Sequence, residues 1–198
     1  MHLPTYMAHF LEDIASLLDP SETADAGAED IAAGIEDIEP EALPEPSRSL
    51  LVHERDMTGT LAAFWGSPIE LRPLRVHREG EVLYRQVVLI ATNKQIPVEA
   101  GAIRIHLDRF PPEALGEITG NRRPLGAILA EYRIPYTCSP RGFFRIPTNR
   151  FLREAFGDVR DTMHYGRRNR LVNPAGELLA EVVEILPMIE GPSAEVDQ

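Results

Sequence analysis

VLYRQVVLI, at residues 82–90, decides the fold class, because it is long enough for a strand and rich in β-branched side chains. Residues 69–76 precede it, and Gly80 lies in the connection, so the two segments are expected to form an antiparallel hairpin. Residues 101–107 (GAIRIHL) alternate regularly and predict a third strand. Strands joined by tight turns are typical of an antiparallel sheet and not of βαβ units.

The rest of the chain adds helices between strands, so the expected fold class is α+β with an antiparallel β-sheet. Apolar spacing, proline positions and turn residues define the other elements. They are helices over residues 57–64 (ending near Gly66), from Pro111 onward and over 124–131, a short strand over 143–146, and a closing hairpin of 162–172 and 177–186 that turns at 173–176.

Charge divides the chain near residue 47. Residues 1–47 hold 12 acidic residues and no Lys or Arg, whereas residues 48–198 hold all 20 basic residues and 19 acidic ones. We interpret residues 1–47 as an acidic tail, with one short helix over residues 6–18 and then a disordered linker, and residues 48–198 as the folded domain. The tail is expected to be solvated; the alternative is that it docks a protein partner.

Several classes of function are not expected. The near-neutral body offers no basic surface for nucleic acid. No apolar run is long enough to span a membrane and no signal peptide is visible, so a cytoplasmic location is expected. Neither a metal-binding motif such as HExxH nor a glycine-rich phosphate loop occurs, so we expect no metal and no cofactor. The single cysteine, Cys138, excludes an internal disulfide, and nothing around it indicates a catalytic thiol.

Charged residues within apolar strands are the candidates for function. Alternation places Arg85 on the face of Val87 and Leu89, and Glu184 on the face of Val182. A charge on an apolar face must pair, reach solvent or bind a ligand. From the residues alone, a buried Arg85–Glu184 pair that only stabilises the fold is favoured over catalysis. The arginine-rich residues 165–170 are either a charged sheet edge or an attractor for an anionic substrate.

The order of these segments resembles that of the chorismate pyruvate-lyase family, including its uncharacterised bacterial relatives. The similar segments are DMT (56–58), LYRQVVL (83–89), RPLGAIL (123–129), and YGRRNRL (165–171) followed by EVVEILP (181–187). The resemblance covers most of residues 49–187. It implies an antiparallel sheet with helices packed over an enclosed ligand pocket.

The resemblance also implies an activity, the elimination of pyruvate from chorismate to give 4-hydroxybenzoate without a cofactor. Arg85 would then bind the ring carboxylate, assisted by the backbone N–H groups of Met57 and Leu125. Glu184 would face the leaving oxygen as a general acid. The implied ligand is therefore a small-molecule carboxylate, with Arg85 and Glu184 as catalytic residues.

The sequence departs from the family pattern in two places. Glu184 lies three residues before Pro187 where the family has four, so strict alignment would put Val183 at the site; we interpret the offset as a deletion that keeps Glu184 in the pocket. Residues 136–151 match loosely, and Arg145 and Asn149 there would line a pocket of different specificity.

Two other functions remain open. One is an enzyme of the same fold that catalyses an elimination or dehydration of another carboxylated substrate in secondary metabolism. The other is a non-catalytic small-molecule-binding domain, like the ligand-sensing domains of some transcription regulators. That reading ranks third here, because such domains follow a basic DNA-binding domain and residues 1–47 are short and acidic.

Overall fold

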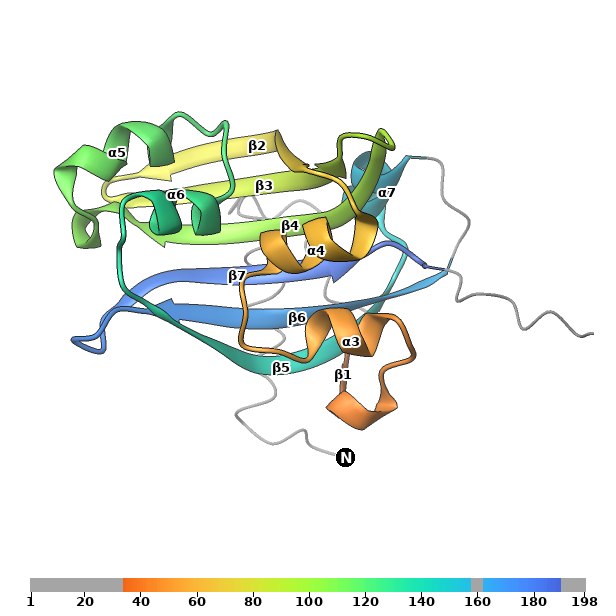
Figure 1. The fold of residues 1–198 in the computed structure, drawn as a ribbon. Helices are drawn as coiled ribbons and strands as arrows, with labels where there is room; N and C mark the ends of the chain where they lie inside the picture. Colours follow the sequence, from red (N-terminus) through yellow and green to blue (C-terminus); the bar gives the residue numbers. More distant parts are fainter. Residues whose placement is uncertain (1–33, 158–161, 190–198) are drawn as a thin grey trace, which may run out of the picture.

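A single seven-stranded antiparallel sheet forms the centre of the computed structural model, which describes residues 34–157 and 162–189 (Figure 1). The strand order is β1-β5-β6-β7-β4-β3-β2, and every neighbouring pair is antiparallel. The strands are β1 Glu36–Ile38, β2 Ile69–Glu79, β3 Val82–Ala91, β4 Ile96–His106, β5 Thr137–Pro147, β6 Met163–Val172 and β7 Leu178–Leu186. The expected α+β class with an antiparallel sheet is confirmed.

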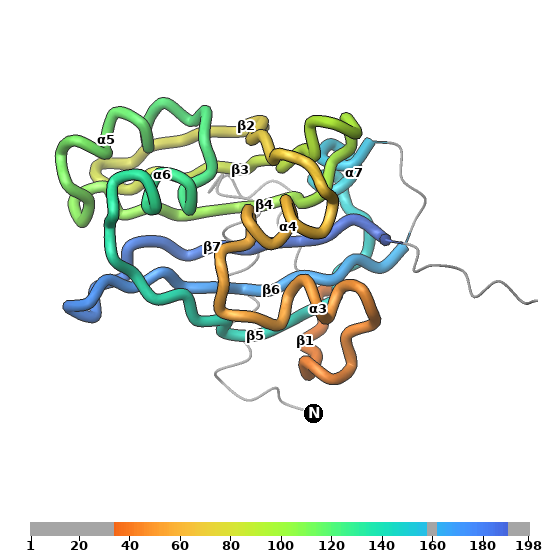
Figure 2. The backbone as a smooth tube through the Cα atoms, in the orientation of Figure 1, coloured from red at the N-terminus to blue at the C-terminus, as the bar shows by residue number. Residues whose placement is uncertain are grey.

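Helices cover both faces of the sheet unequally. The helices are α3 Ser47–Leu51, α4 Met57–Trp65, α5 Pro112–Thr119, α6 Leu125–Glu131 and α7 Arg150–Phe156, with single 3₁₀ turns η1 Pro40–Ala42 and η2 Leu107–Arg109. Figure 1 shows α3 to α6 on one face and α7 on the other. The long connection from β4 to β5 contains both α5 and α6, on the face that α3 and α4 also cover (Figure 2). In the described ranges, no helix combines the length and the apolar character needed to cross a membrane.

Local signals place these elements where the sequence predicts them. Asp56 caps α4 by accepting a hydrogen bond from the N–H of Gly59 at 2.6 Å, and Gly66 ends the helix with a φ of 58°. Gly80, with a φ of 56°, turns the hairpin of β2 and β3. Asn173 accepts backbone hydrogen bonds in the turn between β6 and β7, as expected for that residue.

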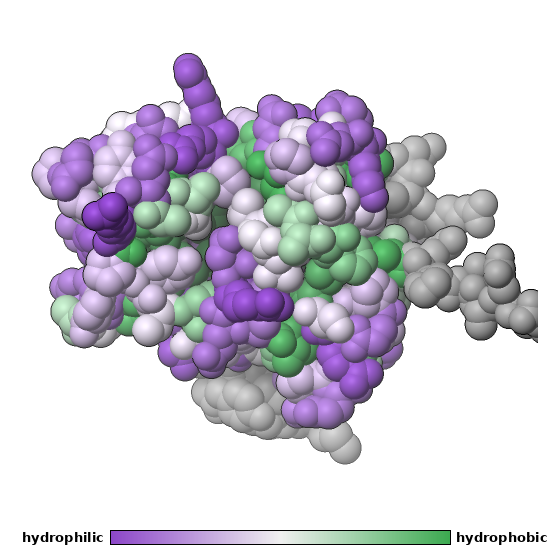
Figure 3. Space-filling view, viewed as in Figure 1, coloured by the Kyte–Doolittle hydropathy of each residue, from purple (hydrophilic) through white to green (hydrophobic). Residues whose placement is uncertain are grey.

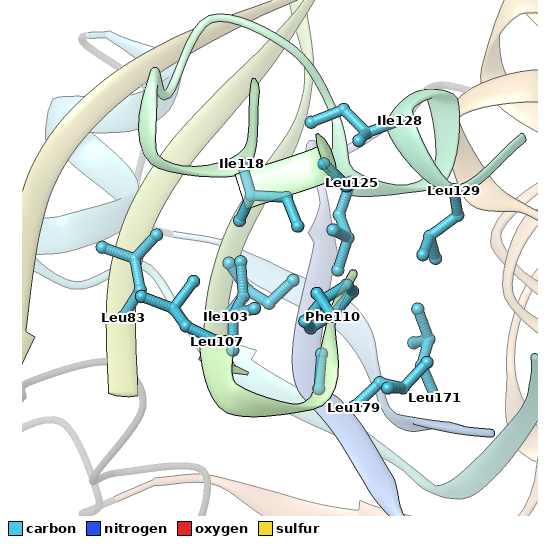
Figure 4. Close-up of a cluster of buried hydrophobic side chains, with 13 residues drawn as sticks. Leu83, Ile103, Leu107, Phe110, Ile118, Leu125, Ile128, Leu129, Leu171 and Leu179 are labelled. Atoms are coloured by element: carbon cyan, nitrogen blue, oxygen red, sulfur yellow. The ribbon is translucent and has the colours of Figure 1, made fainter. Parts of the chain in front are cut away.

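The buried apolar side chains form three groups. One lies on the α7 face and joins Phe144, Val183 and the helix. The other two lie on the opposite face: one packs α5 and α6 on the sheet, and one packs α3 and α4 on it. Figure 4 shows Ile118, Leu125 and Leu129 of the first of these pointing toward the strands. Because two separate cores share one face of the sheet, a space is left between them.

Three elements differ from the expectations. β4 begins at Ile96 instead of residue 101, with Pro97 at a bulge that breaks the alternation. β5 runs from Thr137, well before the expected residue 143, and has its own register shift between Pro140 and Gly142. α7 was not predicted; Asn149 caps it by accepting a hydrogen bond from the N–H of Leu152.

Residues 34–47 also differ, since they were expected to be a disordered linker. β1 pairs with β5, and the side chains of Ile35 and Leu43 are 5% and 1% exposed. These buried apolar residues order the segment against the sheet, so we propose that the folded domain begins near Gly34 and not at residue 48. The expected helix over residues 6–18 lies outside the described residues.

The only tryptophan and the only lysine of the chain lie together at the end of α4. The Lys94 ammonium is 5.3 Å from the centroid of the Trp65 ring, a cation–π distance. Phe64 packs edge-on against the same ring. The contact joins the end of α4 to the turn between β3 and β4.

Candidate ligand pocket

A cavity opens between the two cores on the α4 and α6 face of the sheet. Its empty volume is about 650 Å³, open solvent at the mouth included, and Figure 3 shows the hollow between α6 and α4. The lining residues come from five strands (β2, β3, β4, β6 and β7), from the starts of both helices and from the start of β5. The polar ones are Asp56, Thr58, Arg85, Glu99, Tyr136, Cys138, Arg167, Asn169 and Glu184.

The floor of the cavity is a row of neighbours across four strands. Val87 of β3 is level with Gly101 of β4, Gly101 with Glu184 of β7, and Glu184 with Arg167 of β6. Arg85 lies two residues from Val87 and therefore on the same face. Gly101 has no side chain, so it leaves room in the middle of this row. The register therefore brings Arg85, Glu184 and Arg167 to one cavity.

Arg85 is a buried cation with no ion-pair partner in the described part of the chain. Its side chain lines the cavity and the residue is 2% exposed. Nε and Nη1 have no hydrogen-bond partner among residues 34–157 and 162–189. Burial lowers the pKa of the Arg85 guanidinium to about 10, so the group keeps its proton at neutral pH. A buried, charged donor without a partner is costly and is satisfied best by a bound anion.

Glu184 does not pair with Arg85, so the expectation of a structural Arg85–Glu184 pair is wrong. Its carboxylate instead accepts a hydrogen bond from Nε of Arg167, a fully buried residue of β6. Nη1 of Arg167 donates to the carbonyl oxygens of Leu51 and His53, each at 2.9 Å. Burial opposes the charge of the Arg167 guanidinium, but the neighbouring Glu184 carboxylate outweighs burial and raises the pKa of Arg167.

The strand register places Glu184 in the cavity. Val183, which strict alignment with the family would put at the site, lies in the core on the α7 face. Glu181 is on that face as well and accepts hydrogen bonds from Arg168 at 2.8 Å and from Arg170 at 3.1 Å. Position 184 is therefore the β7 carboxylate that lines the cavity.

Met57 and Leu125 are the first residues of α4 and α6, and both line the cavity. Asp56 lies between the two helix starts: one oxygen caps α4, and the other lies against Gly126 of α6, where a β-carbon would clash with it. The two helices therefore meet at the rim. The four residues singled out by the sequence, Arg85, Glu184, Met57 and Leu125, share one pocket, and their roles stay predictions.

Two other expected lining residues are not in the cavity. Arg145 pairs with Glu36 of β1 at 2.6 Å, and Asn149 caps α7. That expectation is wrong because β5 is longer than the pattern indicated, which carries both residues past the cavity. Tyr136 and Cys138, at the start of β5, line it instead.

The environment of Cys138 does not favour the reactive thiolate form of its side chain. Asn169 donates a hydrogen bond to its sulfur at 2.7 Å, and burial raises the pKa of the thiol. Over the described ranges, no three or more His, Cys, Asp and Glu side chains are grouped as a metal ion would require.

Glu99 is a cavity residue that the sequence reasoning missed. It is 4% exposed, and its Oε2 has no hydrogen-bond partner in the described part of the chain. Burial, with the nearby charge of Glu184 second, raises the pKa of the Glu99 carboxyl well above its usual range. The sequence contains a signal for Glu99. If the predicted strand is extended backward from Gly101, alternation places residue 99 on the pocket face.

Comparisons with known proteins identify the fold. No family model and no curated protein matches the chain. The structure is similar to that of PhnF from Mycobacterium smegmatis (12% identity, 69% of this chain and 65% of PhnF, TM-score 0.54). It is also similar to the separately solved effector domain of PhnF (12% identity, 69% of this chain and 90% of that domain, TM-score 0.55). The chain spans less than two thirds of PhnF, and at this identity it shares a fold with the effector domain of that protein.

Proposed function

We propose that this protein binds a small organic carboxylate in the pocket between α4 and α6, with Arg85 as the anchor, as a non-catalytic ligand-binding domain. The observation that carries the proposal is the buried Arg85 guanidinium, two of whose nitrogens have no partner among the described residues. A carboxylate forks onto a guanidinium through two parallel hydrogen bonds, which would satisfy those donors.

The charges around the pocket favour a ligand with one negative charge at Arg85. The charge of Arg167 is already balanced by Glu184, so Arg85 is the cation left to a ligand. Val87, Leu89 and Ile103 provide apolar walls beside it. Apolar walls with a single charged anchor suit a compact ring or short chain that carries a carboxylate.

The comparisons support binding over catalysis. Two solved structures that share the fold are PhnF and a part of it described as an effector domain. We therefore favour the non-catalytic binding domain, which ranked third from the sequence alone, over the two enzymatic functions. Fold similarity alone does not assign a function, so the pocket residues remain its basis.

A second candidate is the chorismate pyruvate-lyase activity that the sequence resemblance implies. One observation favours it: two carboxyl side chains, Glu99 and Glu184, lie in the same cavity as Arg85. An anion anchor and an acid are what the reaction requires, because loss of the enolpyruvyl group as pyruvate and of one ring proton leaves an aromatic ring.

Two measurements on the purified full chain distinguish the two candidate functions. Titration calorimetry with benzoate, 4-hydroxybenzoate and chorismate measures binding, and chromatography of a chorismate incubation measures pyruvate and hydroxybenzoate. We expect saturable binding without turnover. Arg85→Met should abolish binding, whereas Met at the exposed Arg72 of β2 should leave it unchanged.

Turnover that is lost in Arg85→Met would establish the lyase instead. Two outcomes would contradict the proposed anchor. One is equal binding by the wild type and Arg85→Met, and the other is that folded wild-type protein binds none of the three carboxylates.

A further inference from the structure

Glu99 lies in the pocket, and the proposed binding function assigns it no role. It lies on β4, level with Leu89 of β3 and next to the bulge at Pro97. Bulges redirect side chains and are frequent beside binding sites. A β-carbon built on Gly101 would lie 3.2 Å from Oε1 of Glu99 and 3.3 Å from Cγ2 of Val87, so the Glu99 carboxyl lies directly over that glycine.

Two carboxyl groups therefore lie beside Gly101, one on the neighbouring strand and one on its own strand. Glu184 is its partner on β7, and Glu99 precedes it on β4. Neighbouring carboxyl groups in a buried site resist being charged together. Asp56, at the start of α4, adds a third negative charge that acts on Glu99, and Arg167 is the cation that opposes them.

The cation is paired with one of the two carboxyl groups, while its buried Nη2 has no partner in the described residues. Arg167 donates its Nε to Glu184, and its Nη1 is used by backbone carbonyls. No ion pair or hydrogen bond satisfies Oε2 of Glu99 in the described residues. Burial and the charge of Glu184 raise the pKa of Glu99, while Glu184 has its counter-ion. Of the two carboxyl groups, Glu184 has a counter-ion and Glu99 has an oxygen without a partner in the described residues.

We propose that Glu99 is a neutral carboxylic acid that donates a hydrogen bond into the pocket and selects ligands carrying an uncharged oxygen acceptor in addition to the carboxylate bound by Arg85. The inference rests on the proposed function and specifies its ligand class. The acceptor is a hydroxyl, ether or carbonyl oxygen, because a second carboxylate would meet Glu184 and Asp56 as well.

The distance between the two anchors places the acceptor far from the carboxylate. Arg85 is level with Ile103, four residues along β4 from Glu99. At the rise of an extended strand this separates the two backbone positions by about 13 Å. Both side chains line the same cavity, so the oxygen belongs at the opposite end of a ring from the carboxylate and not beside it.

The protonation of Glu99 is tested without any ligand. Infrared spectroscopy of the full chain at neutral pH detects the C=O stretch of a protonated carboxyl group. We expect a band that disappears in Glu99→Gln and persists in the exposed control Glu79→Gln. Identical spectra of the wild type and Glu99→Gln would overturn the neutral form of Glu99.

The selection is tested with benzoate, 4-hydroxybenzoate and 2-hydroxybenzoate as calorimetric probes. We expect the wild type to prefer the 4-hydroxy compound over benzoate by up to about tenfold, the value of one hydrogen bond. Glu99→Leu should remove this preference while keeping benzoate affinity, and Glu99→Gln, which retains a donor, should preserve part of it.

The outcomes separate the two proposals. A preference that survives in Glu99→Leu, or that favours the 2-hydroxy compound, overturns the selection by Glu99 and leaves the Arg85 anchor intact. Failure of all three probes to bind the wild type overturns the carboxylate site and the selection with it, while the infrared band still reports whether Glu99 is neutral.

Discussion

Arg85 and Arg167 lie on the same face of the sheet and are both buried, but their charges have different surroundings. Arg167 has a carboxylate and two backbone carbonyls as partners, whereas Arg85 has a cavity. A buried charge with hydrogen-bonded partners is compensated in the folded state, whereas a buried charge without partners lowers the stability of that state. Removal of the two arginines should therefore change stability in opposite directions.

Arg85→Met is expected to stabilise the ligand-free protein, on the order of 1–3 kcal/mol, because an unsatisfied buried donor is replaced by an apolar chain. Urea unfolding without ligand measures the change, with Arg72→Met as the exposed control. Excess ligand should then stabilise the wild type and not the variant. A less stable Arg85→Met would mean that the guanidinium contributes to the fold and is not held for a ligand.

Arg167→Met is expected to destabilise the protein by about 3–5 kcal/mol, because it leaves Glu184 buried without its counter-ion. Adding Glu184→Gln to the same chain should restore part of the loss, since the orphaned charge is then gone. Urea unfolding of the single and double variants measures this coupling, and Arg122→Met provides an exposed control. Strict additivity of the two changes would rule out the pair as a unit.

The sequence predicted where the site residues lie better than it predicted which residues pair with them. Alternation placed Arg85 and Glu184 on pocket faces correctly, because the side-chain period of a strand is two. It paired them wrongly, since pairing depends on which strands become neighbours, and β6 brought Arg167 beside Glu184. Glu99 was missed because Pro97 disguised the start of β4.

At the scale of elements, the sequence predicted the regular hairpins and helices and missed those that depend on distant contacts. The hairpin of β2 and β3 and that of β6 and β7 carry their own turn residues. β1 has only three residues and exists because β5 offers it an edge. No local pattern announces a strand of that kind.

Leu43→Ala tests whether the segment before α3 belongs to the domain. Leu43 is buried in the core beneath α3 and α4, so its truncation should lower the free energy of unfolding by about 2–5 kcal/mol. Chemical denaturation measures the loss, and Glu41→Ala, at an exposed neighbouring position, should change little. An unchanged midpoint in Leu43→Ala would return the segment to the tail.

At the scale of the whole molecule, buried histidines connect stability to pH. His164 stacks on Phe156, and its Nδ1 contacts the carbonyl oxygen of Leu186 at 3.2 Å. Burial lowers the pKa of His164 from its ordinary 6.5, and burial lowers those of His53 and His106 as well. The unfolded chain therefore binds protons at pH values where the folded chain does not.

Stability should consequently be lost as the pH falls below about 6.5, since protons then favour the unfolded state. Glu99 acts in the opposite sense, because its raised pKa makes the folded state the better proton acceptor above the usual carboxyl range. Comparison with His164→Asn isolates the histidine: urea unfolding across this pH range should show a shallower acid-side loss in the variant. The exposed His77→Asn should behave like the wild type, and an equal slope in all three would exclude His164.

The contact between Lys94 and Trp65 makes the molecule its own optical reporter. The only indole of the chain ends α4, the helix whose first residue lines the pocket, and the only ε-amine lies over it. Tryptophan emission therefore reads a single place, at the far end of a pocket wall. A label attached to Lys94 adds an energy-transfer partner 5.3 Å from that ring in the unlabelled protein. Movement of α4 when a ligand enters would become visible without introducing any new residue.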